Sequence, residues 1–331
     1  FSSSAYVWRF SLYFVLVFFL RIRRPPRSTL DRSSAASDVY KRQAIDTALD
    51  QEGVSVRLIL VDDGSPNPEF MERAARRREG VAVVRQPAQG VSEARNTGLQ
   101  HVEADLVAFL DDDDVWHPRR LLRLSEVLTA DPEAVGAYSG GWFLDDAGEA
   151  CGVPWGAAQA SREDLLRGIA PLPIFGSVLF RSQTCRAVGG FAATYRYAED
   201  DDFTLRVLQR GALRGVDEPL FGYRRHANNV SNTDRRITAA ASDQMLRASR
   251  ADALARGDLT AADWLDENRR RLRGGVARGF GHEIPARLRV RDFSRARELS
   301  NYGLRTDPRN LVLGVAQKLV SFARSTVGAR R

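Results

Sequence analysis

The feature that most constrains the fold is an alternation of apolar runs with helical segments between residues 44 and 110. The segments 68–78 and 92–101 have helical periodicity, and they separate runs that are too short for helices. Strands that are apolar on both faces and alternate with helices form parallel sheets covered by helices on both sides. The sequence therefore predicts an α/β fold with a mostly parallel sheet flanked by helices. Three runs have the length and composition of its buried strands: VSVRLILV (54–61), VAVV (81–84) and LVAFL (106–110).

Carboxylates follow two of these predicted strands directly. Asp62 and Asp63 end the first, and the run Asp111–Asp114 ends the third. Ligands of open parallel sheets bind beyond the carboxyl ends of the strands, and adjacent carboxylates repel one another unless a cation or solvent compensates. Oxygen ligands suit Mg²⁺ or Mn²⁺, which can take their remaining ligands from water and a diphosphate. We therefore expect a divalent cation at this run, the alternative being a solvated acidic turn before the helix near Pro118.

Three further motifs carry side chains suited to chemistry. Arg95, in GVSEARNTGL, is placed to reach a diphosphate or to support the aspartates, although alone such a motif is more often structural. Glu199 and Asp200 begin a predicted helix, where acids usually stabilise the helix dipole but can also take a proton from a hydroxyl. His226, in YRRH, can complete a metal site or be purely structural.

Charge is unevenly distributed along the chain. The net charge is +7, yet residues 44–231 hold 20 basic and 29 acidic side chains, whereas residues 232–331 hold 21 and 11. An acidic central segment argues against a nucleic-acid partner, and the basic segment suits peripheral contact with an anionic membrane surface. Cys151 and Cys185 have neither disulfide-framework nor zinc-ligand spacing, which favours a reducing cytoplasm.

The two ends of the chain differ from its centre. The apolar run 10–20 is shorter than the roughly 20 residues of a spanning helix. The pieces RIRRPPRSTL and SSAASDVYKRQ resemble translated sequencing-adapter read-through, so residues 1–43 are predicted to be a non-native, disordered head. Residues 232–331 are predicted to form a helical, basic extension. In its last helix Val312, Val315, Leu319 and Phe322 share one face, which favours packing against the domain over a membrane-surface helix.

Five motifs together resemble family 2 glycosyltransferases of the GT-A fold: LILVDDGSPN, GVSEARNTGL, LVAFLDDDDVWHP, GGF…YAEDDDFTLRVLQRG and YRRH. The resemblance covers residues 44–231 and implies a GT-A-like, Rossmann-like domain. It lacks the family's first strand, which ends in a Pro-x-Tyr-Asn-like turn, because residues 1–43 occupy that place.

The resemblance also implies roles for individual residues. Asp63, with Asp62, would lie at the nucleoside. Asp111 and Asp113 would form the DxD pair that holds metal and diphosphate, with Asp112 and Arg95 beside the donor. Asp113 would be the direct metal ligand, and His226 would join it. Asp200 would be the catalytic base, with Glu199 next to it.

The function implied is inverting transfer of a sugar from a nucleotide-diphosphate donor to a hydroxyl group. The acceptor would be a glycan or a lipid-linked glycan, and the setting polysaccharide or glycan assembly at the cytoplasmic face of a membrane. One alternative is a nucleotidyltransferase, which attacks phosphorus, although no glycine-rich phosphate loop with a lysine is visible. The other is an inactive, truncated chain that acts only by binding.

Overall fold

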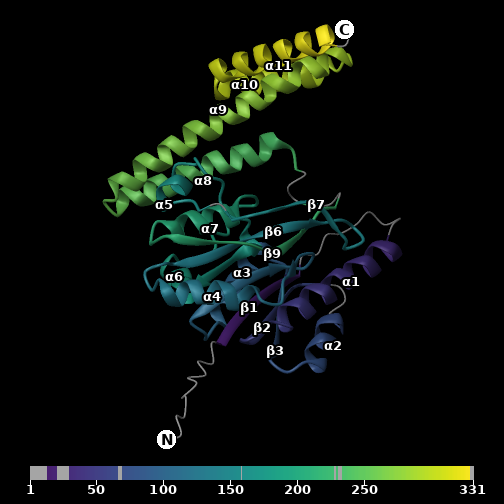
Figure 1. Cartoon of the computed structure of the whole chain (residues 1–331), viewed down its shortest axis with the longest axis vertical. Coiled ribbons are helices and arrows are strands. Elements are labelled where there is room, and N and C mark those ends of the chain that lie inside the picture. Colours follow the sequence, from purple (N-terminus) through teal and green to yellow (C-terminus); the bar gives the residue numbers. More distant parts are fainter. Residues whose placement is uncertain are drawn as a thin grey trace, which may run out of the picture. The chain divides into compact units, whose positions relative to one another are not determined.

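The computed structural model describes residues 13–20, 30–65, 69–157, 159–226, 229 and 233–328, with side chains from residue 38 to 321 apart from that of residue 77. Its elements are shown in Figure 1. The chain divides into two compact units. The first comprises residues 1–162, 172–195 and 199–229, and the second comprises residues 163–171, 196–198 and 230–331.

The first unit is built on one mixed sheet. The strand order is β3-β2-β1-β4-β8-β6-β9-β5, and β7 pairs with β6. The strands are β1 (Tyr13–Leu20), β2 (Ser55–Asp63), β3 (Val81–Gln86), β4 (Leu106–Asp111), β5 (Val115–Trp116), β6 (Gly136–Leu144), β7 (Ala150–Trp155), β8 (Val178–Arg181) and β9 (Leu213–Arg224).

The helices of this unit include α1 to α4, α6 and α7. Their bounds, with those of the short 3₁₀ turn η1, are α1 (Leu30–Leu49), α2 (Glu69–Arg77), α3 (Val91–Gln100), α4 (Arg120–Ala130), η1 (Phe175–Ser177), α6 (Ser182–Ala187) and α7 (Glu199–Leu208).

The sheet has a parallel half and a mixed half. β3, β2, β1 and β4 pair in parallel, as the alternation of apolar runs and helices predicts. β8 is antiparallel to both β4 and β6, whereas β9 is parallel to β6 and antiparallel to β5. The predicted α/β fold with flanking helices is confirmed, and the predicted parallel pairing holds for the half in which strands and helices alternate.

Residues 13–20 form a central strand, which corrects the predicted head. β1 lies between β2 and β4, with Leu20 opposite Asp62 and Phe19 opposite Asp111. α1 then spans residues 30–49, and Ile45 in it is buried in the core. An unbroken run of eight apolar residues is what a central parallel strand requires. The prediction of a disordered head and an empty strand position is therefore wrong for these residues, whereas their adapter-like origin stays a prediction.

Alternating residues of the strands face two different groups of helices. Leu58 and Leu110 pack in a core cluster with residues of α1, α2 and α4. The next residue along each strand faces the other side. There Phe109 belongs to an aromatic cluster in which Phe191 and Phe203 stack with ring centroids 4.1 Å apart. Phe203 is part of α7, so this cluster positions α7 against the sheet face on which Asp111 also lies.

The second unit consists mainly of helices, as predicted for residues 232–331. Asp234, Asp258 and Asp292 cap α8, α9 and α10 by accepting backbone N–H hydrogen bonds. Phe280, Leu299 and Leu311 lie in a core shared by the last three helices. The elements of this unit are α5 (Arg162–Leu166), α8 (Arg235–Ala255), α9 (Leu259–Arg289), α10 (Phe293–Thr306) and α11 (Pro308–Gly328).

The buried face of α11 differs from the predicted one. Val312 and Leu319 are 64% and 54% exposed, whereas Leu311 is buried and Val315 packs against the core. A Cβ on Gly314 would collide with the backbone of α9 at Arg278, so the two helices touch backbone to backbone. This glycine contact sets the face of α11 that turns inward. The side chain of Phe322 lies outside the described residues. Within the described part of the chain, no helix is long and apolar enough to cross a membrane.

Candidate active site

The acidic run lies at the carboxyl edge of the sheet, as the sequence predicts. Asp111 is the last residue of β4, and the backbone N–H of Asp114 donates to its carbonyl oxygen, which closes a tight turn before β5. The carboxylate of Asp111 is 47% exposed, and that of Asp113 is 27% exposed. Asp62, the penultimate residue of β2, lies at the same edge on the other side of β1, because Asp62 aligns with Leu20 and Asp111 with Phe19 at the end of β1.

Arg95 joins two of the acidic motifs. It projects from α3 and is 3% exposed. Its Nη2 donates to Oδ1 of Asp111 over 3.0 Å, and its Nη1 donates to Oε1 of Glu199 over 3.4 Å. The guanidinium also lies 4.7 Å from the ring centroid of Phe175, a favourable cation–π distance. Arg95 therefore brings the acids that follow β4 into contact with those that begin α7.

The charge balance around Arg95 keeps it protonated. Burial lowers its pKa, but the charges of Asp111, Glu199 and Asp200 outweigh this effect and raise the pKa above its ordinary value. Its buried Nε has no hydrogen-bond partner among the described residues. The carboxylate of Asp200 accepts a hydrogen bond from the backbone N–H of Asp201. The negative charge of Asp200 also raises the pKa of Arg95.

A second contact joins the acidic turn to the end of β9. Nε2 of His226 lies 2.9 Å from Oδ2 of Asp113. Arg224, which is fully buried, donates through Nε to the carbonyl oxygen of Asp113, and its backbone N–H donates to Asp114. These three bonds fix the turn in position. His226 is among the site residues predicted from the sequence, whereas Arg224 is not, although its place in the YRRH motif was the available signal.

Several acids in this region have raised pKa values. Burial, followed by the charges of Asp113 and Asp111, raises the pKa of Asp114, and Arg224 only partly offsets this. The pKa of Glu199 is raised by burial and then by Asp200, with Arg95 opposing. Burial is the main cause for both acids, and the neighbouring carboxylates add to it.

The site suits a hard divalent cation. Asp111 and Asp113 offer partly exposed carboxylate oxygens, and their negative charges contribute to the raised pKa of the adjacent Asp114. Among the described residues, no three His, Cys, Asp or Glu side chains meet as a ready-made metal cluster. Mg²⁺ and similar ions bind through one or two carboxylates together with water and substrate phosphates, so a pair of aspartates is a sufficient protein contribution.

Asp62 and Asp63 shape the loops at this edge. Asp62 is 1% exposed and accepts hydrogen bonds from the backbone N–H and the hydroxyl group of Ser65. Asp63 accepts hydrogen bonds from the side chain of Gln86 and from the backbone N–H groups of Gln89 and Gly90. Both carboxylates thus hold the segments that follow β2 and β3. Their predicted contact with a nucleoside stays a prediction.

Two side chains that the sequence analysis missed hold the Gly-Gly-Phe turn before α7. Asn96 donates to the carbonyl oxygen of Phe191 and accepts its N–H, over 2.9 and 2.7 Å. Arg206 pairs with Asp202 at 2.6 Å and donates to the carbonyl oxygen of Gly190. Asn96 directly follows Arg95 in the sequence, and Arg206 lies one helical turn after Asp202. Both signals were present inside the quoted motifs.

A family comparison agrees with this geometry. Residues 40–147 match the model of Glycosyl transferase family 2. The chain carries a family 2 glycosyltransferase domain. The predicted family is thereby confirmed. The matched range of this domain includes Asp62, Asp63, Arg95, Asp111 and Asp113, whereas α7 and the end of β9 lie beyond it. Their place in the site follows from the contacts of Arg95 and Asp113.

Curated relatives of the domain come from bacteria. The succinoglycan biosynthesis protein ExoW of Rhizobium meliloti is 33% identical over 139 residues, which cover 40% of this chain and 42% of ExoW. The uncharacterized glycosyltransferase EpsJ of Bacillus subtilis is 28% identical over 206 residues, which cover 58% of this chain and 59% of EpsJ. The matches therefore span less than two thirds of either relative.

Solved structures confirm the GT-A-like fold of the family 2 domain. S. aureus TarS 1-349 in complex with UDP-GlcNAc has a TM-score of 0.56 at 13% identity, covering 87% of this chain and 90% of that one. The mannosyltransferase PcManGT from Pyrobaculum calidifontis, in complex with GDP-Man and Mn²⁺, has a TM-score of 0.52 at 14% identity, covering 93% and 87%. At these identities the likeness concerns the fold alone.

Proposed function

We propose that this protein transfers a sugar from a nucleotide-diphosphate donor to a hydroxyl group of a glycan or lipid-linked acceptor, in polysaccharide or glycan biosynthesis. The observation that carries the proposal is the bridge from Asp111 through Arg95 to Glu199. It joins the acids suited to a metal and diphosphate to the acids suited to deprotonating an acceptor. The names of ExoW and of the TarS and PcManGT complexes support the same substrate class.

In the proposed donor site, Asp111 and Asp113 hold Mn²⁺ or Mg²⁺, and Asp113 is the direct ligand. Bound there, the cation would supply positive charge to the departing diphosphate. His226 orients the carboxylate of Asp113 through their 2.9 Å contact. Asp112 lies beside the donor. The loops that Asp62 and Asp63 hold together form the nucleoside side of the site.

In the proposed transfer step, Asp200 removes the proton from the acceptor hydroxyl. The oxygen then attacks the anomeric carbon from the face opposite the diphosphate, and a new carbon–oxygen bond forms as the bond to the diphosphate breaks. The nucleoside diphosphate leaves, and the sugar is inverted. Glu199 is engaged by Arg95, which leaves Asp200 as the base of the pair. The reaction takes place at the cytoplasmic face of a membrane.

The test is an incubation of the purified chain with a panel of labelled nucleotide sugars and Mn²⁺, followed by identification of the released nucleotide. Release of a nucleoside diphosphate together with labelled acceptor supports glycosyl transfer. Release of pyrophosphate would instead identify a nucleotidyltransferase. Donor binding without any release would identify a protein that acts only by binding.

A further inference from the structure

The second unit exposes apolar side chains where α9 meets α10. Leu288, Val290 and Phe293 are 47%, 69% and 62% exposed, although they lie within six residues of one another. Arg289 and Arg291 alternate with them and are exposed as well. We call these five residues the α9–α10 tip. Exposed apolar side chains that cluster in this way are typical of a surface that binds a membrane or another protein.

Arg291 occupies a backbone conformation that does not suit an arginine. Its φ of 59° lies in the left-handed region, just after the end of α9. Helices that end in this conformation usually place glycine there, because a side chain disfavours it. Arg291 therefore keeps an exposed cation at a position where glycine would carry less backbone strain.

The acids near the α9–α10 tip are already paired. Glu283 and Asp292 contact Arg287, and Glu298 contacts Arg295. Among the described residues, no carboxylate lies within ion-pair distance of Arg291. The surroundings also favour an anionic partner, since basic side chains outnumber acidic ones by 21 to 11 in residues 232–331.

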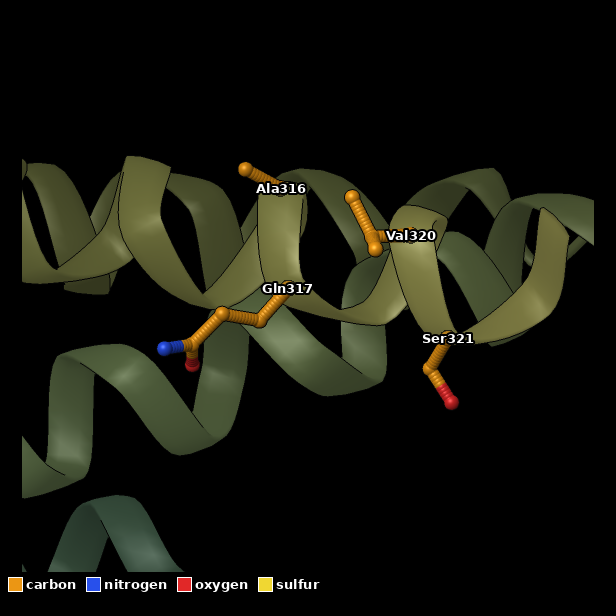
Figure 2. A pocket seen from close by; sticks show the side chains of 4 residues that line it. All are labelled: Ala316, Gln317, Val320 and Ser321. Atoms are coloured by element: carbon orange, nitrogen blue, oxygen red, sulfur yellow. The ribbon is translucent and has the colours of Figure 1, made fainter. Parts of the chain in front are cut away.

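The later part of α11 extends toward the same end of α9. Gly314 meets α9 at Arg278, and Gln317 contacts His282, so the two helices run in the same direction (Figure 1). A hollow on α11 is lined by Ala316, Gln317, Val320 and Ser321, as Figure 2 shows. Val320 is 53% exposed. Because a single helix lines this hollow, it does not enclose a ligand.

We propose that the α9–α10 tip binds the surface of an anionic lipid bilayer. Arg289 and Arg291 contact lipid phosphates, while Leu288, Val290 and Phe293 enter the boundary between headgroups and acyl chains. The exposed apolar side chains match the acyl-chain boundary of such a bilayer, and the excess of arginines matches its anionic headgroups. A neutral protein partner would match only the exposed apolar side chains. The inference does not depend on glycosyl transfer.

The experiment is co-sedimentation of the full chain with vesicles of phosphatidylcholine alone, or of two parts phosphatidylcholine and one part phosphatidylglycerol. We expect binding only to the anionic vesicles, and weaker binding as salt is raised. Phe293→Ser should weaken partitioning about tenfold, since a buried aromatic side chain is lost. Arg291→Gly should weaken it about fivefold while relieving the left-handed strain, so its melting temperature should not fall.

Matched controls lie at the other end of α10. Leu304 is 54% exposed and Arg305 is exposed, so Leu304→Ser and Arg305→Gln change similar side chains away from the tip. Both should bind vesicles like the original chain. Equal loss in tip and control variants, or equal binding to neutral vesicles, would overturn the proposal. So would a chain that ignores vesicles but forms dimers that Phe293→Ser disrupts. No donor is added, so the outcome is independent of the transfer assay.

Discussion

At the scale of single residues, Arg95 is placed so that one cation serves two acids. Its two terminal nitrogens contact carboxylates from motifs far apart in the sequence, and its planar face lies on Phe175. A lysine has a single terminal nitrogen and no planar face, so it cannot make all three contacts. The geometry of the site therefore depends on guanidinium shape as well as on charge.

Replacing Arg95 with lysine should impair catalysis more than folding. We expect Arg95→Lys to lower kcat about 100-fold, because Asp111 and Glu199 would no longer be held in one arrangement. The measurements are steady-state kinetics and a melting curve. Arg57→Lys is the control, since Arg57 also pairs with an acid, Glu103, but on the exposed surface. Unchanged kcat in Arg95→Lys would show that the bridge does not organise the site.

Replacing Asp200 with asparagine should remove the base while keeping its shape. We expect Asp200→Asn to lower kcat about 1000-fold, within the usual range for a lost general base, and to leave donor affinity intact. Kinetics and donor titration measure the two effects. The neighbour Asp201 provides the control, because Asp201→Asn makes the same substitution one position along α7, at a carboxyl group whose pKa burial raises to about 8.

The contrasting variant acts on the donor side of the site. Asp113→Ala removes the proposed metal ligand, so it should abolish donor binding that depends on Mn²⁺. If Asp200→Asn turned over normally, Asp200 would not be the base. If Asp113→Ala bound donor as before, the metal site would lie elsewhere.

At the scale of elements, the Gly-Gly-Phe turn shows how a motif without reactive groups supports the site. Gly190 has a φ of 71°, and Asn96 fills the space where a side chain would begin. Asn96 in turn holds both backbone groups of Phe191, whose ring stacks on Phe203 of α7. The turn therefore fixes α7 relative to α3.

This arrangement predicts a difference between adjacent glycines. Gly189 also has a positive φ, 80°, but nothing lies near its missing side chain. Gly189→Ala should therefore cost only the backbone penalty, about 1 kcal/mol of unfolding free energy. Gly190→Ala should cost about 1–3 kcal/mol more, since it also displaces Asn96. Urea denaturation of the two variants measures the difference. Equal costs would mean that Asn96 moves aside freely.

The elements differ in how well the sequence predicts them. β2, β3 and β4 are apolar runs between helices, and each lies within two residues of its predicted bounds. The antiparallel pairing of β8 could not be read in the same way, because it depends on partners distant in the sequence. Similarly, the face of α11 that packs inward is the one on which Gly314 contacts α9. The apolar face predicted from Val312 and Leu319 is exposed instead.

At the scale of the whole molecule, the division into two units implies that unfolding need not be a single transition. Glu267 lies in the helical unit, where it accepts hydrogen bonds from Arg167 and Arg271. These bonds lower its pKa from 4.5 to about 2. Glu267 therefore links the segment containing α5 to α9 within that unit.

The stabilisation from Glu267 should depend on pH in a defined direction. With a pKa lower in the folded state, the contribution is complete above about pH 4.5 and is lost as the pH falls toward 2. Glu267→Gln should lower the melting temperature at pH 7, and the difference should shrink between pH 4.5 and 3. Circular dichroism melts measure it. Asp263→Asn, on the exposed surface of α9, should cause little change at either pH. A pH-independent gap would contradict the assignment.

The site is more predictable from sequence than the molecule that surrounds it. The sequence predicts Asp111, Asp113, Arg95 and Glu199 as site residues, and the structure shows three contacts among them and His226: Arg95 with Asp111, Arg95 with Glu199, and His226 with Asp113. Asp111 and Asp113 follow a predicted strand and Glu199 begins a predicted helix, so the sequence indicates where these side chains lie along the chain. The place of β1 was not predicted, because an apolar run reveals its length and burial but not which gap it fills.

The place of β1 has a consequence for how this sheet can change. β1 pairs with β2 and β4, and the site acids Asp62 and Asp111 lie on these two strands, opposite the apolar residues Leu20 and Phe19 of β1. The central strand therefore supplies backbone pairing, whereas the strands on either side of it supply the acids. Because β1 pairs directly with both of these strands, a change in its register would shift β2 and β4 relative to each other and so change the spacing of Asp62 and Asp111.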